Sequence, residues 1–175
     1  MAKLLYSASM SLDGFIAGPG GDMSWLTEHL GAPNPTAERL LGQVGAILAG
    51  RGTFGGGDPN EGTDKEGAFG GEYHGPQFVL THRPPAEPVP GVTFLGDLRT
   101  AVAEAKAAAG DRYVNLLGAN VAAQCLEEGI LDEVLVFPVP VLLGDGTRLF
   151  EHPGGTRVRL QPIDDEYPHW YRVVR

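Results

Sequence analysis

The fold is decided by residues 3–26, which read KLLYSASMSLDGFIAGPGGDMSWL. The run from Lys3 to Met10 is short and apolar, which is typical of a strand buried in a sheet. It continues into Ser11-Leu12-Asp13-Gly14-Phe15-Ile16-Ala17, where the Asp-Gly pair favours a turn. Trp25 then supplies a large aromatic side chain. The stretch predicts a strand, a mobile loop and an aromatic anchor for that loop.

Length and composition predict one soluble domain over residues 1–175. The chain has 175 residues, 42% of them hydrophobic, which is enough for a core. Its 13 basic and 22 acidic residues give a formal net charge of −9, so neither nucleic acid nor an anionic membrane is expected as a partner. Cys125 is the single cysteine and cannot form an internal disulfide. No apolar run approaches the roughly 20 residues that span a bilayer, and a cytoplasmic setting is expected.

Two hydrophobic periodicities alternate along the chain and predict an α/β fold. Short apolar runs predict strands, and helical spacing after a capping residue predicts helices. The predicted strands are Leu4–Met10, Ala46–Ala49, Phe78–Thr81, Val92–Leu95, Tyr113–Leu117 and Val134–Leu143, and the predicted helices begin at Asn34-Pro35, Asp97 and Asn120. The glycine-rich residues Gly55–Gly71 are predicted to form a loop.

The sheet is predicted to be mixed, with parallel strands early in the chain and antiparallel strands late. Pro138 and Pro140 interrupt the apolar run Val134–Leu143. Because proline has no N–H for the strand ladder, this strand is expected to be bulged or to lie at a sheet edge.

Three turns at predicted strand ends favour a bound nucleotide. Gly50-Arg51-Gly52-Thr53 offers backbone N–H groups, a hydroxyl and a guanidinium, which suit a diphosphate. Gly118-Ala119-Asn120-Val121 opens a helix, whose amino terminus attracts an anion. Thr81-His82-Arg83 ends a third strand with groups that can pair with a phosphate. Each turn, taken alone, also fits an ordinary strand exit.

The order of these motifs resembles the dihydrofolate reductase-like superfamily, especially the reductase domain of riboflavin biosynthesis. The resemblance runs over nearly the whole chain. Its motifs are Ser11-Leu12-Asp13-Gly14, the Gly-Arg-x-Thr turn at Gly50, the strand-glycine-helix at Gly118, Gly129–Glu133 and Pro140–Gly146. It implies a three-layer α/β fold in which helices flank a mixed central sheet.

The same resemblance implies NADPH as the cofactor. By this likeness the nicotinamide would be met by Ile16, Ala17 and Trp25. The diphosphate would be bound by Gly50, Arg51, Thr53, Gly118, Ala119, Asn120 and Val121. The ribose that carries the 2′-phosphate would be bound by Thr81, His82 and Arg83. The family usually has two glycines, often joined by a cis peptide, where this chain has Gly118-Ala119. Whether that bond is cis is left open.

The implied activity is hydride transfer from NADPH to a small heterocyclic or carbonyl-type substrate. Asp13 is the predicted catalytic group, and Asp13, Phe15 and Glu38 are the predicted substrate contacts. Asp13 also fits a turn-forming role, and Glu38 also fits an acid at a helix amino terminus. The riboflavin branch commonly has a basic residue after Asp-Gly, so Phe15 argues against its phosphorylated intermediate.

Two other functions stay open at this point. One is the 5-amino-6-(5-phosphoribosylamino)uracil reductase of riboflavin biosynthesis, and the other is a non-catalytic small-molecule binding protein on the same fold. The five histidines show no metal-ligand spacing, so no metal site is predicted. The resemblance also implies a homodimer formed through the proline-bearing strand and the apolar tail.

Overall fold

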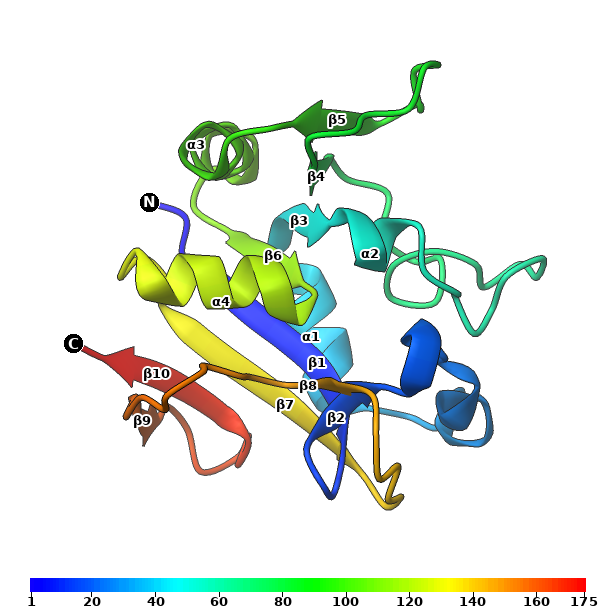
Figure 1. The fold of residues 1–175 in the computed structure, drawn as a ribbon, viewed down its shortest axis with the longest axis vertical. Coiled ribbons are helices and arrows are strands. Elements are labelled where there is room, and N and C mark those ends of the chain that lie inside the picture. The colour runs from blue at the N-terminus through cyan, green and yellow to red at the C-terminus, as the bar shows by residue number, and fades with distance from the viewer.

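The computed structural model describes residues 1–175 and shows a central sheet with helices on both faces (Figure 1). The sheet has eight strands in the order β5-β4-β3-β6-β1-β7-β10-β9, and β2 pairs with β8 separately. The strands are β1 (Leu4–Ser11), β2 (Phe15–Ala17), β3 (Val44–Gly50), β4 (Gln77–Leu80), β5 (Val92–Leu95), β6 (Tyr113–Leu117), β7 (Glu133–Val139), β8 (Thr147–Arg148), β9 (Arg159–Pro162) and β10 (Trp170–Val174). The helices are η1 (Pro19–Gly21), η2 (Ser24–His29), α1 (Pro35–Gln43), α2 (Arg51–Phe54), α3 (Leu98–Ala109) and α4 (Ala119–Glu127).

The sheet is mixed, as the sequence predicted. Every neighbouring pair from β5 across to β7 is parallel, whereas β10 runs antiparallel to β7 and β9 antiparallel to β10. The parallel strands therefore all end at one edge of the sheet, which is where ligands of open α/β sheets bind.

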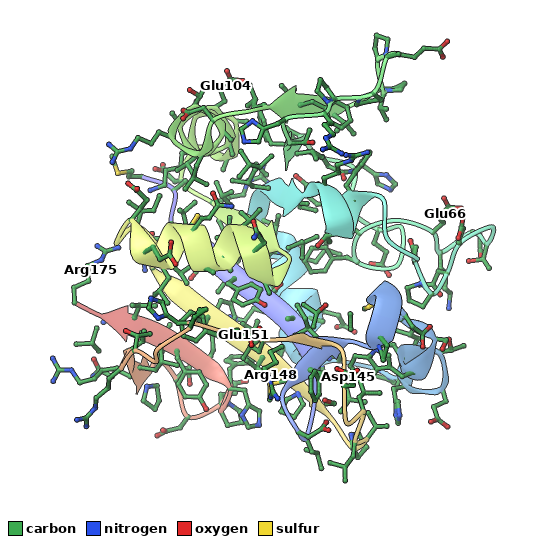
Figure 2. The ribbon with its side chains drawn as sticks, in the orientation of Figure 1. Glu66, Glu104, Asp145, Arg148, Glu151 and Arg175 are labelled. Carbon is green, nitrogen blue, oxygen red and sulfur yellow. The ribbon has the colours of Figure 1, made fainter.

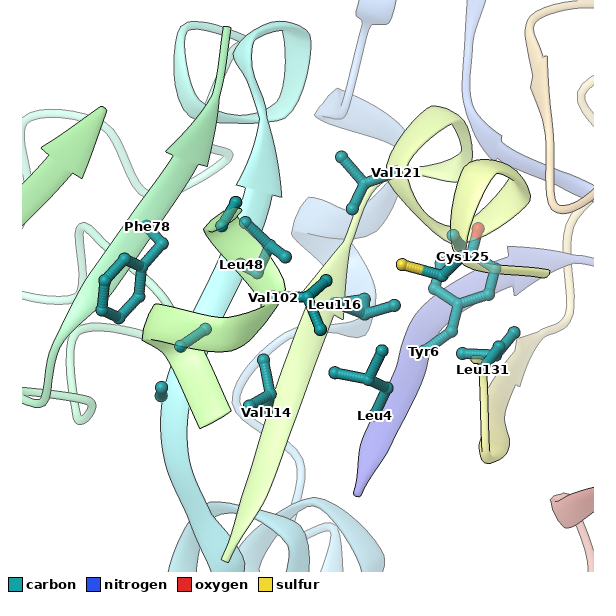
Figure 3. Packing of buried hydrophobic residues seen from close by; sticks show 14 of the residues in the cluster. Leu4, Tyr6, Leu48, Phe78, Val102, Val114, Leu116, Val121, Cys125 and Leu131 are labelled. Carbon is teal, nitrogen blue, oxygen red and sulfur yellow. The ribbon is translucent and has the colours of Figure 1, made fainter. Parts of the chain in front are cut away.

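The two faces of the sheet carry separate hydrophobic cores because side chains alternate along each strand. Leu4 and Tyr6 of β1 pack with α3 and α4 on one face (Figure 3). Leu5 lies on the other face with Leu40 of α1 and Trp170 of β10. The result is the three-layer α/β architecture that the sequence predicted.

Local sequence signals set the helix ends. The Asn34 side chain accepts the Ala37 N–H at 3.0 Å at the start of α1, and Asp97 accepts the Thr100 N–H at 2.8 Å at the start of α3. Gly110 ends α3 at a φ of 66°, where a residue with a Cβ is strained. None of the helices is long and apolar enough to cross a membrane.

Pro138 lies where β7 has a neighbour on one side only. β10 pairs with β7 over Glu133–Leu135, whereas β1 follows β7 as far as Val139. The Val136 N–H points to the β10 side, where it donates to His169 O at 3.0 Å. Two residues later the Pro138 nitrogen faces the same side beyond the end of the β10 pairing, so no ladder bond is lost. Of the two predicted alternatives, a bulge or an edge position, the edge position is confirmed for this half of β7, and the strand ends at Val139 and not at the predicted Leu143.

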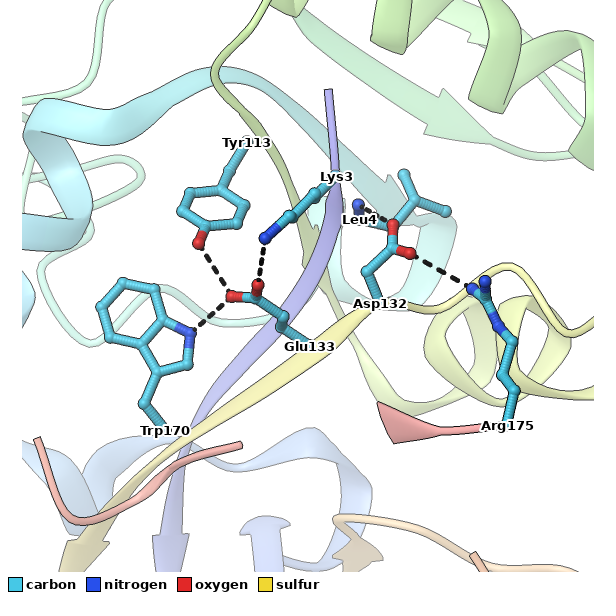
Figure 4. A network of polar contacts seen from close by, with 7 residues as sticks. All are labelled: Lys3, Leu4, Tyr113, Asp132, Glu133, Trp170 and Arg175. Carbon is cyan, nitrogen blue, oxygen red and sulfur yellow. Dashed lines mark hydrogen bonds and ion pairs between the residues drawn. The ribbon is translucent and has the colours of Figure 1, made fainter. Parts of the chain in front are cut away.

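Glu133 joins several strands near the amino-terminal ends of the parallel strands, opposite the end where ligands are expected (Figure 4). Its carboxylate is buried and accepts hydrogen bonds from Lys3 Nζ at 2.9 Å, Tyr113 Oη at 2.8 Å and Trp170 Nε1 at 2.9 Å. These donors belong to or adjoin β1, β6 and β10. The charge is thus matched by a cation and two neutral donors, as a buried carboxylate requires.

Candidate active site

The turns predicted to bind a nucleotide meet at the carboxyl edge of the sheet. Ala49 is in register with Leu117 of β6, and Gly50 is in register with Leu80 of β4. The turns after β3, β6 and β4 are therefore adjacent in space, although they are far apart in the sequence.

Gly118 and Thr53 are in direct contact across two of these turns. A Cβ placed on Gly118 would collide with Thr53 Oγ1, and Gly118 has a φ of 103°. A Cβ on Gly50 would lie 3.3 Å from Val121 Cγ2. The approach of the turns thus depends on glycine at position 118, for both space and backbone conformation.

The amino termini at this edge are open to an anion. Neither α2 nor α4 has a side-chain cap, so their first N–H groups are left for a ligand. Arg51 and Thr53 are exposed, and Arg51 takes part in no ion pair of the structure. The donors of the predicted diphosphate site are therefore together and available.

Two residues of the second turn place their side chains away from the predicted anion site. Val121 is 1% exposed and its side chain packs in the core beside α3, so only its backbone can reach a ligand. Asn120 is exposed and its Oδ1 accepts the Gln124 Nε2 at 2.7 Å within α4. The chain contains no cis peptide bond, so the Gly118-Ala119 bond is trans.

The turn after β4 lies beside the diphosphate turns. Thr81 Oγ1 accepts the Arg83 N–H at 3.0 Å, which fixes the turn, and the His82 and Arg83 side chains are exposed. Nearby, Phe54 of α2 meets Phe94 of β5 edge to face with 5.5 Å between ring centroids. The triplet is placed where basic groups are accessible at the same sheet edge.

Strands β1 and β6 separate before they reach this edge. They pair only through Leu4, Leu5 and Tyr6 of β1, after which β1 continues beside β7 to Ser11. The side of β1 that faces β6 is therefore unpaired from Ser7 onward. This split between β1 and β6 runs toward the Asp13 turn.

Asp13 is held in place by three donors. Its carboxylate accepts Ser11 Oγ at 2.6 Å, the Leu143 N–H at 3.1 Å and the Gly144 N–H at 2.7 Å. The Ser11 hydrogen bond, followed by that from Leu143, lowers the pKa of Asp13 to about 2. A carboxylate with this pKa is ionised at neutral pH. Its geometry is that of a positioning residue.

The segment after Asp13 forms a flap with the segment 143–149. Phe15 and Ala17 of β2 pair with Arg148 and Thr147 of β8, and the Leu149 N–H donates to Gly14 O at 2.9 Å. Gly146 packs so closely on Ala17 that a Cβ would not fit. The predicted nicotinamide loop, including Ile16 and Ala17, is therefore one strand of a two-stranded flap.

Phe15 packs inside this flap and does not line an open pocket. Its side chain is 4% exposed, and the Arg148 guanidinium carbon lies 4.7 Å from the ring centroid. Figure 2 shows Arg148 beside β2 and β8. The predicted substrate contact through Phe15 is corrected accordingly: the exposed group at this point is the Arg148 cation.

The structure favours Trp25 as a site residue and does not favour Glu38. Trp25 is half-buried on η2, and its buried indole Nε1 has no hydrogen-bond partner in the protein. An unpaired buried N–H is costly and is available to a ligand. Glu38 is exposed in the first turn of α1 and its side chain makes no hydrogen bond or ion pair, so the helix dipole explains it and the predicted substrate contact has no support.

Sequence reasoning missed two features of the site and one unpaired polar side chain in the core. Arg148 and the backbone of Leu143 and Gly144 reach it through long-range pairing, for which no local pattern exists. Asn115 is fully buried on β6, and neither its Oδ1 nor its Nδ2 has a partner. An asparagine inside the apolar run Tyr113–Leu117 was the available signal. The structure places no group of three or more His, Cys, Asp or Glu side chains together as metal ligands.

The fold and this edge define a protein of the dihydrofolate reductase-like class. The RibD C-terminal domain family matches residues 2–165, and the chain belongs to that family. It is 28% identical over 161 residues to the uncharacterized protein YwjB of Bacillus subtilis (strain 168), covering 91% of this chain and 89% of that one.

Two solved structures show the same fold. A candidate riboflavin biosynthesis protein from Shewanella sp. PV-4 has a TM-score of 0.70 at 22% identity, covering 99% of this chain and 97% of that one. Dihydrofolate reductase from Enterococcus faecalis, complexed with NADP(H) and RAB-propyl, has a TM-score of 0.56 at 15% identity, covering 98% and 93%.

Proposed function

We propose that this chain is an NADPH-dependent reductase that transfers a hydride to a small heterocyclic or carbonyl-type substrate. The observation that carries the proposal is the contact of Gly118 with Thr53, which joins the two diphosphate turns. Membership of the RibD C-terminal domain family and a fold shared with an NADP(H)-bound dihydrofolate reductase support it.

The residues at the edge of the sheet fit the cofactor's phosphates. The free N–H groups of α2 and α4 and the Arg51 guanidinium would hold the diphosphate. Arg83, with Thr81 and His82, would pair with the 2′-phosphate and favour NADPH over NADH. NADPH supplies the hydride, and the chain supplies its orientation.

The flap would cover the reacting end of the cofactor. Ile16 and Ala17 lie on β2, directly beyond the split between β1 and β6. Asp13 fastens this strand to Gly144, so the flap presents a fixed backbone to the nicotinamide. A cover that excludes water and fixes the approach of the substrate lowers the barrier to transfer.

A second candidate function is the uracil reductase step of riboflavin biosynthesis, and Arg148 is the observation that favours it. The chain lacks a basic residue at position 15, yet the paired strand places a guanidinium over Phe15. Arg148 takes part in no ion pair of the structure and could meet a substrate phosphate. Phe15 is therefore compatible with a phosphorylated substrate. Turnover of the phosphoribosylamino pyrimidine by the wild type, lost in Arg148→Ala, would select this function.

A homodimer is also proposed, through the apolar segment that follows β7. Leu12 is 63% exposed and Leu142 is 71% exposed, and their segments are joined by the Leu12 N–H bond to Val141 O at 2.9 Å. Exposed leucines on two joined segments favour contact with another apolar surface. Light scattering at micromolar concentration should give a dimeric mass that Leu142→Asp reduces to a monomer, and a monomeric wild type would refute the dimer.

Fluorescence titration with NADPH and NADH tests the cofactor site. The buried indole Nε1 of Trp25 has no partner in the protein, whereas Trp170 is buried and donates to Glu133. We expect saturable quenching of tryptophan fluorescence and an affinity for NADPH that exceeds that for NADH by about tenfold or more, or about 1.4 kcal/mol. The quenching should be lost in Trp25→Phe. Absence of binding by either nucleotide at millimolar concentration would leave a ligand-binding protein that lacks the reductase function.

A further inference from the structure

A cavity lies at the end of the sheet opposite the candidate active site. It has a volume of about 330 Å³ and is lined by the end of α4, the segment 150–158 and the end of β10. That volume falls at the lower end of the range for small-molecule pockets. Figure 2 shows Arg175, one of its residues, at the free end of β10.

The floor of this cavity is apolar. Leu126, Leu131 and Val173 form it, and Phe150 contributes an aromatic ring that is 38% exposed. An apolar ligand that covers this ring would remove apolar surface from water, which stabilises the bound state.

Polar groups of both signs line the cavity beside its apolar residues. They are His152, Arg157, Arg175 and the carboxylate of Glu127. Arg175 is paired with Asp132 at 3.2 Å, but Arg157 takes part in no ion pair or side-chain hydrogen bond. The Arg157 guanidinium is therefore free to pair with an external anion.

Helix α4 separates this cavity from the cofactor edge. Its first turn follows Gly118 at the diphosphate site, and its last residues, Leu126 and Glu127, line the cavity. Nine helical residues span about 13 Å. The two sites therefore lie at opposite ends of one helix and have no lining residue in common.

We propose that this cavity binds a small amphipathic anion, with an aromatic or aliphatic body on Leu126, Leu131 and Phe150 and a carboxylate or sulfonate at Arg157. The unpaired Arg157 guanidinium would select the anion over a neutral ligand of the same shape. The proposal is independent of the reductase function.

The test uses 8-anilinonaphthalene-1-sulfonate as the probe and N-phenyl-1-naphthylamine as its analogue without the sulfonate. The full-length chain should enhance the fluorescence of the sulfonate saturably and bind it more tightly than the neutral analogue. Arg157→Glu should lower the affinity for the sulfonate probe by about tenfold or more. Arg159→Glu is the matched control, because it makes the same charge change two residues away at an exposed position outside the cavity.

Arg51→Ala shows whether the probe binds at the cofactor edge instead. Loss of sulfonate affinity in Arg51→Ala with none in Arg157→Glu would overturn the proposal. So would equal affinity for the two probes, equal loss in Arg157→Glu and Arg159→Glu, or no saturable binding. Unchanged circular dichroism of the variants excludes unfolding as the cause, and the exposed position of Arg157 makes a folded variant the expected result.

Discussion

The Asp13 carboxylate accepts the Gly144 N–H at 2.7 Å and so ties the turn after β1 to the segment after β7. The same carboxylate accepts the Leu143 N–H, and the strands beyond it pair as β2 and β8. A residue predicted as a catalytic group thus acts on the structure of the flap. Its effect on catalysis follows from where it holds Ile16 and Ala17.

Asp13→Asn should lower turnover more than it lowers NADPH affinity. An amide has a single acceptor oxygen, so it cannot satisfy Ser11, Leu143 and Gly144 together, and the flap loosens while the diphosphate turns stay intact. Steady-state kinetics with a turned-over substrate and fluorescence titration measure the two quantities. Equal losses in both would indicate that Asp13 supports the whole fold.

The stabilising effect of Asp13 should depend on pH. Because its folded pKa is lowered to about 2, its contribution is fully present above the pKa of an unfolded aspartate and is lost as the pH falls through about 2. The difference in Tm between the wild type and Asp13→Asn should be constant above about pH 5 and should narrow toward about pH 2. A difference that does not change with pH would contradict this assignment.

Gly118→Ala should weaken NADPH binding and destabilise the fold. The new Cβ would strike Thr53 Oγ1, and the φ of 103° is strained for alanine. Gly129→Ala is the matched control, because Gly129 has a φ of 68° but no neighbour within 4 Å. Thermal unfolding and NADPH titration should show a cofactor defect in Gly118→Ala only. Equal affinities in the two variants would remove the Gly118 turn from the site.

Thr53→Ala tests whether the clash between the new Cβ at position 118 and Thr53 Oγ1 causes the loss of stability in Gly118→Ala. In the double variant with Gly118→Ala the hydroxyl is gone, and part of the lost stability should return. Because the two residues touch, their effects should be strongly non-additive. Simple addition of the two losses would mean that backbone strain at Gly118 accounts for the whole effect.

The elements of the fold were predictable because their causes are local. Asn34 and Asp97 cap helices through bonds to residues three positions away, and apolar runs such as Tyr113–Leu117 became buried strands. The site was predictable in part because Gly50 and Gly118 follow strands whose ends must share an edge. The flap was not, since Asp13 and Gly144 are 131 positions apart. Nothing near Phe15 in the sequence indicates that Arg148 covers it.

Arg51→Ala should weaken NADPH binding by about 1.5–3 kcal/mol through loss of a charged hydrogen bond. Arg99→Ala removes the same charge from α3, where Arg99 is exposed and pairs with Glu128 at 2.6 Å, and should leave binding unchanged. Titration at two salt concentrations adds a check, since screening should weaken the wild type more than Arg51→Ala. An unchanged dissociation constant in Arg51→Ala would remove the Gly50 turn from the site.

Glu133→Gln should lower the free energy of unfolding by about 2 kcal/mol or more. The carboxylate is 2% exposed, and one of its oxygens accepts both Tyr113 Oη and Trp170 Nε1. A glutamine turned to keep its oxygen there presents an NH₂ group to Lys3, and the opposite orientation leaves both neutral donors without an acceptor. Lys3→Met removes only the half-exposed cation and should cost less than about 1 kcal/mol. Urea unfolding measures both, and similar losses in the two variants would mean that the ion pair to Lys3, and not the buried neutral donors, dominates the network.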